Sequence, residues 1–226
     1  MSSRFTRLED VVSDPVFPEV DVALRRGRHV DRDDGDLYQL VVDAQDLLEE
    51  FYRRYRCELV QQSDGYFYLV PLGEQVSHRY LSPGEMLVGQ ALALFYLDPA
   101  KLQSAGTCTR TQLLARLLGL VGVRELAKAL EPRRRNFDDE RIVHGVIRTK
   151  VATALRRLAS LGFAEFLDTE TIRPRAAVLR FAEPVRGLQD MEAALERLVA
   201  SGQIAVGHHG DGDADEVDPD AEERDE

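Results

Sequence analysis

Cationic side chains recur in the C-terminal part of this chain, on a segment whose spacing predicts a long helix. Between residues 140 and 161 the apolar residues fall three and four apart, which places them on one face. Polar residues lie opposite: Arg148, Thr149, Lys150, Thr153, Arg156, Arg157 and Ser160. Further arginines follow on a predicted hairpin. Because cationic side chains suit phosphate contacts, which position DNA without reading its sequence, the predicted DNA contacts are Arg148, Lys150, Arg156, Arg157, Arg173, Arg175 and Arg180. The alternative is a solvated helix face with ordinary charges.

Residues that could support catalysis are present, but they form no catalytic motif. The sequence contains no G-x-x-x-x-G-K-[ST] loop, no G-x-S-x-G elbow and no H-E-x-x-H pair. Cys57 and Cys108 are far apart, and His29 and His144 are expected to be surface or packing residues. We therefore expect a protein that is not an enzyme and that holds no cofactor.

One run of carboxylates imitates a calcium loop. Asp211, Asp213, Asp215 and Glu222 stand at positions 1, 3, 5 and 12 of an EF-hand pattern. The sixth position, where that loop needs a glycine, is Glu216, and no helices are predicted on either side. We expect no metal site here.

Charge is distributed unevenly along the chain. The formal net charge is −11, of which residues 208–226 supply −9. Residues 1–71 carry −6, whereas residues 124–186 carry +5. A basic module thus lies between acidic segments, so nucleic acid remains a possible partner despite a pI near 5.0. The acidic tail has almost nothing to bury and is expected to be disordered.

The elements that would position these side chains follow the same order twice. In the first half, a helix over residues 36–55 precedes a hairpin of strands 57–62 and 65–71, joined by Ser63-Asp64-Gly65. In the second half, helices begin at Ser82 and near Thr109, and a short helix lies within residues 119–139. The long helix then ends at Gly162 and a second hairpin pairs residues 163–167 with 176–181.

This order predicts a mainly α protein with small β-hairpins (α+β), built as tandem winged-helix domains. We expect an N-terminal winged-helix domain over residues 1–80 and a C-terminal one over residues 81–186. A C-terminal helix over 187–206 and the acidic tail over 207–226 follow. No apolar run approaches ~18 residues and the N-terminus lacks an apolar signal core, so we expect no membrane segment and a cytoplasmic location.

Several segments resemble the MukE family. They are DPVFPEVDVALRRGRHV (residues 14–30), EEFYRRYRCELVQQSDGYFYLVP (49–71), LVG (87–89), LRRLASLGFAEFL (155–167) and VLRFAEPV (178–185). The resemblance extends to about residue 200, and residues 119–139 depart most from it.

The resemblance implies a non-catalytic homodimer of tandem winged helices in a bacterial condensin. Its expected partners are a MukF-like kleisin, a MukB-like SMC ATPase reached through that kleisin, and double-stranded DNA bound non-specifically. The implied role is DNA clamping and chromosome condensation, organisation and segregation, in the cytoplasm and at the nucleoid. The alternative is a free-standing winged-helix transcriptional regulator, which would bind one DNA sequence tightly by itself.

Overall fold

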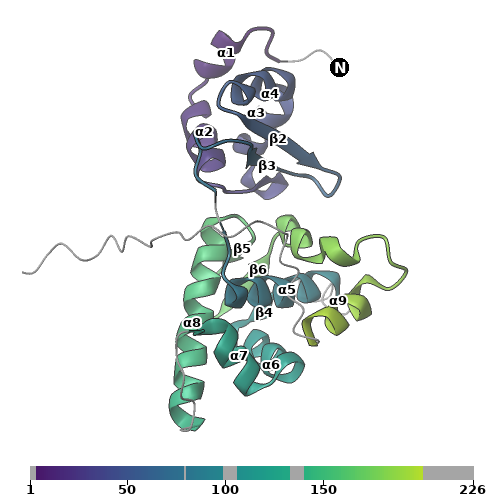
Figure 1. The fold of residues 1–226 in the computed structure, drawn as a ribbon. Helices are drawn as coiled ribbons and strands as arrows, with labels where there is room; N and C mark the ends of the chain where they lie inside the picture. Colours follow the sequence, from purple (N-terminus) through teal and green to yellow (C-terminus); the bar gives the residue numbers. More distant parts are fainter. Residues whose placement is uncertain (1–3, 79, 99–105, 133–139, 201–226) are drawn as a thin grey trace, which may run out of the picture.

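The computed structural model describes residues 4–78, 80–98, 106–132 and 140–200. The described chain is mainly helical and carries two small antiparallel sheets of three strands each. Figure 1 shows the N-terminal half, in purple and blue, above the remainder of the chain. The expected α+β class with small β-hairpins is confirmed.

The first half combines short helices with one sheet. Its elements are α1 (Leu8–Val12), α2 (Phe17–Arg25), β1 (Val30–Asp31), the 3-10 helix η1 (Arg32–Asp34), α3 (Asp36–Asp43), α4 (Gln45–Arg53), β2 (Cys57–Gln62) and β3 (Tyr66–Pro71). The sheet has the order β1-β3-β2, and β2 pairs with β3 as the expected hairpin.

The predicted helix over residues 36–55 is wrong in one respect, because it is divided into α3 and α4. Ala44 stands between them with φ −116° and ψ 15°, outside the helical region. Leu40, Leu48 and Tyr52 are nevertheless all buried, on both sides of the break. Since the apolar spacing continues through Ala44, the sequence pattern gave no sign of the interruption.

The second half is larger. It contains α5 (Pro83–Leu97), β4 (Cys108–Thr109), α6 (Arg110–Val121), α7 (Val123–Leu130), α8 (Glu140–Ser160), β5 (Ala164–Phe166), β6 (Thr171–Pro174), the 3-10 helix η3 (Ala176–Val185) and α9 (Met191–Ala200). Capping boxes begin two of these helices, Ser82 with Glu85 at α5 and Thr109 with Gln112 at α6. Both satisfy amide groups that the first helical turn leaves without partners.

The predicted second hairpin requires a correction. Its second strand is β6, whereas residues 176–181, which we expected to be a strand, begin η3. The buried residues of η3 include Val178, Phe181, Ala182 and Val185, a helical rather than an alternating spacing. Arg180 therefore lies on η3 and not on the hairpin.

The two sheets have equivalent connectivity. In each, a short strand that precedes the later helices pairs with the last strand, which is central: the orders are β1-β3-β2 and β4-β6-β5. In each, the last two strands form the hairpin. The two sheets therefore share one strand order.

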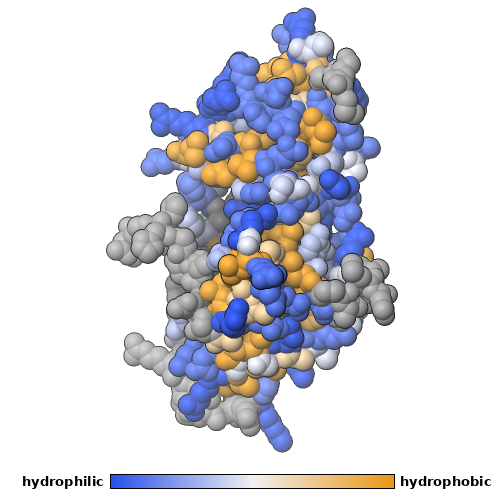
Figure 2. All heavy atoms as spheres, turned by 90° about the vertical axis from the view of Figure 1, so that its right-hand side faces the viewer, coloured by the Kyte–Doolittle hydropathy of each residue, from blue (hydrophilic) through white to orange (hydrophobic). Residues whose placement is uncertain are grey.

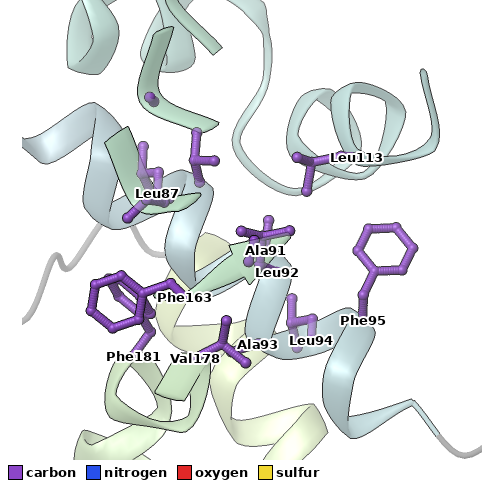
Figure 3. Packing of buried hydrophobic residues seen from close by; sticks show 14 of the residues in the cluster. Leu87, Ala91, Leu92, Ala93, Leu94, Phe95, Leu113, Phe163, Val178 and Phe181 are labelled. Carbon is purple, nitrogen blue, oxygen red and sulfur yellow. The ribbon is translucent and has the colours of Figure 1, made fainter. Parts of the chain in front are cut away.

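Helix α5 lies at the centre of the second core. It is buried on nearly all sides, as expected of a helix that is apolar all round. Figure 3 shows Leu87, Ala91 and Leu94 of α5 among residues from other elements of this core. Phe181 packs so closely that a Cβ on Gly89 would lie 2.4 Å from its ring. Helix α9 joins the same core through Ala194, Leu195 and Val199.

Strand β3 links the two cores. Phe67 and Leu69 belong to the core of the first half, whereas Tyr66 and Tyr68 belong to the core of the second. Alternating side chains on a strand point to opposite faces, so β3 is covered on both. Figure 2 shows apolar residues at the surface of each half. Within the described ranges, no helix is both long enough and apolar enough to span a membrane.

Candidate nucleic-acid interface

Helix α8 extends along one side of the second half (Figure 1) and presents a cationic face. Its other face, with Val143, Ile147, Leu155 and Leu158, is buried in the core. Arg141, Arg148 and Arg156 are exposed and follow one another at intervals of seven and eight residues. At ~3.6 residues per turn, seven residues span about two turns and eight pass them by about 80°, so the three side chains project within about a quarter-turn of one another, about 10 to 12 Å apart along the axis.

Arg148 and Arg156 are the available cations of this face. Neither forms an ion pair or a hydrogen bond within the described part of the chain. Arg148 borders an open hollow of about 510 Å³ together with Arg141, His144 and Gly145. The exposed cations therefore have both the charge and the room to receive a phosphate group.

The remaining predicted contacts on α8 already have partners. Lys150 Nζ lies 2.5 Å from a carboxylate oxygen of Glu131. Arg157 lies 3.3 Å from Glu85 and donates a hydrogen bond to the Tyr80 carbonyl at 2.6 Å. Lys150 and Arg157 are 43% and 46% exposed, so a phosphate can reach both. The exposed Lys150 pair is weak, whereas Arg157 would have to leave Glu85, whose side chain is only 10% exposed.

Arg175, another predicted DNA contact, is buried in this structure. Its guanidinium is 6% exposed and is held by two carboxylates of the first half, Asp31 and Asp34. Nε donates to Asp31 at 3.0 Å and Nη1 to Asp34 at 3.1 Å. Burial alone would lower the pKa of Arg175, but these hydrogen bonds outweigh it and raise the pKa. Arg175 therefore stays charged and joins the two halves.

Arg173 also turns toward carboxylates. It pairs with Glu165 on the neighbouring strand at 2.5 Å and lies 3.6 Å from Asp33 of the first half. A third pair across the junction, Arg186 with Asp64, is 2.5 Å long. The acidic first half and the basic second half thus neutralise each other across their contact, which accounts for part of the charge asymmetry in the sequence.

Arg180 contacts a buried histidine at the junction. His29 Nδ1 lies 2.9 Å from the Leu161 carbonyl and Nε2 lies 2.7 Å from Arg180 Nη1. A carbonyl only accepts and a guanidinium only donates, so Nδ1 carries the proton and the ring is neutral. Burial, followed by the charge of Arg180, lowers the pKa of His29 to about 3. The expectation that His29 is a packing residue is confirmed.

Gly162 lies at the same junction between the halves, where there is no room for a side chain. It ends α8 with φ +80°, the conformation expected of a helix-capping glycine. A Cβ at this position would lie 2.3 Å from the His29 carbonyl oxygen. Gly162 therefore both ends the helix and permits the approach of the first half.

Sequence reasoning missed the junction, because its partners lie far apart in the chain. Asp31 and Arg175 are separated by 144 residues, and neither stands in a recognisable motif. The opposite net charges of the two halves were the one available signal. Cys57 and Cys108 are buried and form no disulfide, and the described residues contain no group of His, Cys, Asp or Glu suited to a metal. The EF-hand-like run at 211–222 lies outside the described residues.

These features define a mainly helical α+β protein whose two halves are joined by buried ion pairs and whose longest helix presents a cationic face. Comparison with known proteins gives the family. A model of the MukE-like family matches residues 5–226, so the chain belongs to the MukE family.

Individual relatives agree with this assignment. The chromosome partition protein MukE of Shigella flexneri is 36% identical over 200 residues, which cover 87% of this chain and 88% of that protein. The MukE of Vibrio cholerae serotype O1 is 38% identical over 201 residues, covering 88% and 86%. That of Aliivibrio salmonicida is 33% identical over 222 residues, covering 96% and 91%.

Proposed function

We propose that this chain is a non-catalytic subunit of a chromosome partition complex. The observation that carries the proposal is the family match over residues 5–226, together with relatives named as chromosome partition proteins. The complex would act in the cytoplasm, at the nucleoid, in condensation, organisation and segregation of chromosomes.

The proposed partners are those that family membership suggests. A MukF-like kleisin would bind the chain directly, and a MukB-like SMC ATPase would be reached through the kleisin. The chain itself would be a homodimer. This assignment leaves ATP hydrolysis to the ATPase, so the role of the present chain is to bind and to position.

Each half is proposed to be a winged-helix domain. The support is the order of elements: a short strand, helices and a closing hairpin, with the last strand central in each sheet. In this fold the helix before the hairpin often enters a DNA groove. That helix is α8 in the second half, and it carries the cationic face.

DNA contact is therefore assigned to α8, without sequence specificity. Arg148 and Arg156 are the principal contacts, because both are exposed and without partners among the described residues. Lys150 and Arg157 contribute if they exchange their carboxylates for phosphates. Arg173, Arg175 and Arg180 are assigned instead to the junction, where they contact carboxylates or His29.

Purification of the tagged full chain from its native host tests the proposal. Recovery of a kleisin and a large coiled-coil ATPase in stable amounts is the expected result. Recovery of the chain alone, combined with tight binding to a single DNA sequence, would instead favour a free-standing transcriptional regulator. A Lys150→Gln variant should recover the same partners, because it changes a proposed DNA contact and one exposed ion pair, with Glu131.

A further inference from the structure

A cleft of about 420 Å³ lies where the two halves meet. In the first half, the cleft is lined by the end of α2 and by β3. In the second half, it is lined by the start of α5, Phe163 and η3. Small-molecule sites in proteins occupy ~300 to 1,000 Å³ and are common between domains. The cleft therefore has the size and the position of a ligand site.

One wall of the cleft is a continuous row of rings. The ring centroids of Tyr68 and His29 are 5.2 Å apart, those of His29 and Phe163 are 4.4 Å apart, and those of Phe163 and Phe181 are 4.8 Å apart. Figure 3 shows Phe163 and Phe181 side by side next to α5. All four residues are at least nine-tenths buried, so the wall is held by the core and offers an apolar surface.

Arg180 places an exposed positive charge at the cleft. Its guanidinium lies 4.0 Å from the centroid of the Tyr68 ring and donates to His29 Nε2 at 2.7 Å. No carboxylate of the described chain pairs with it. The other arginine of the lining, Arg25, differs because it is paired with Asp21 at 2.7 Å. Arg180 is exposed, so an anion that enters from solvent can reach its guanidinium.

We propose that this cleft binds a small aromatic or aliphatic molecule that carries a single carboxylate. The carboxylate would accept hydrogen bonds from Arg180, and the apolar body would lie against Phe163 and Phe181. Arg180 is held over Tyr68 and by His29, so little of its freedom is lost on binding. The inference goes beyond the proposed function, because DNA contact is assigned to α8.

The test uses the full chain and two probes of nearly equal shape, 3-phenylpropionate and its uncharged amide. Binding is measured by calorimetry and by changes in the NMR resonances of the cleft residues. A hydrogen-bonded charge pair favours the acid, so we expect the acid to bind at least about tenfold more tightly than the amide. Arg180→Gln should abolish that preference, whereas the matched control Arg148→Gln, which removes the same charge from α8, should retain it.

Circular dichroism must first show that the Arg180→Gln variant is folded. If that variant is unfolded, Arg180→Lys, which keeps the charge, tests the site instead. Equal affinities for acid and amide, a preserved preference in Arg180→Gln, or no binding of either probe would each overturn the proposal. So would a peptide of residues 208–226 that shifts the same resonances when neither probe does. The DNA affinity of Arg180→Gln should stay unchanged, so failure here is distinct from failure of the proposed function.

Discussion

Replacement of Arg175 by methionine should destabilise the protein strongly. The variant keeps the length and apolar stem of the side chain but removes the charge that faces Asp31 and Asp34. Those carboxylates have side chains only 4% and 6% exposed, so water cannot compensate for the loss. Asp34 keeps its pair with Arg28 at 2.5 Å, whereas Asp31 is left without an ion-pair partner in the described chain. Removal of one partner from a buried ion pair costs about 3 to 5 kcal/mol. Hydrogen bonds from Arg175 to both carboxylates place this case within that range.

Urea denaturation followed by far-ultraviolet circular dichroism measures this cost. Arg186→Gln is the matched control, because Arg186 also joins the halves, through Asp64, but its pair is 33% and 24% exposed. That variant should cost at most about 1 kcal/mol, as more exposed pairs do. A combined Arg175→Met, Asp31→Asn and Asp34→Asn variant should recover part of the loss, since no buried charge is then left alone.

Equal, small costs for Arg175→Met and Arg186→Gln would refute the reasoning. Such a result would mean that the carboxylates are solvated in solution and that the halves are not joined by a buried pair. DNA binding provides a second criterion. A folded Arg175→Met complex should keep its affinity for DNA, because Arg175 faces the first half and not the solvent.

Three further outcomes are expected. The pKa of His29 is lowered to about 3 in the folded state, so the unfolded chain takes up a proton below about pH 6.5 and the folded chain does not. In chemical denaturation the free energy of unfolding should therefore fall by about 1.6 kcal/mol from pH 6.5 to 5, and by less in His29→Gln. An equal pH dependence in both proteins would contradict this. Deletion of residues 208–226, which carry −9, should leave the melting temperature unchanged and raise DNA affinity at low salt only, because a tethered polyanion competes with phosphate and salt screens it. Equal affinities with and without the tail at two salt concentrations would make it a solubility tail instead. Light scattering at micromolar concentration should give the mass of a dimer, and a monomeric mass would exclude the homodimer.

Local signals in the sequence were sufficient for several helix boundaries, but not for α1, α2, β1 or β6, which were not predicted. Ser82 and Thr109 each accept a hydrogen bond from a residue three positions later, and Gly162 adopts a positive φ that other residues avoid. Such features depend on neighbours in the chain, so they are readable without a structure. Strand β3 is intermediate: its alternation showed that two faces needed cover, but not that the second half covers one of them.

The candidate site was predictable only in part, because local sequence signals do not show which distant residues meet. The amphipathic pattern of α8 correctly separated its buried and exposed faces. It could not show that Lys150 and Arg157 meet Glu131 and Glu85, or that Arg175 is buried, because those partners are brought together by tertiary packing. A count of arginines therefore overestimates the charge that is available to DNA.

The salt dependence of DNA binding by the assembled complex tests the account most directly. Each phosphate contact contributes about 0.9 to the slope of log K against log salt concentration. If α8 contacts DNA, Arg148→Gln with Arg156→Gln lowers the magnitude of that slope by about 2 and weakens binding equally for unrelated DNA sequences. Arg186→Gln, which removes a junction charge, should leave the slope as it is. An unchanged slope in the Arg148 and Arg156 variant would contradict the assignment of DNA contact to α8.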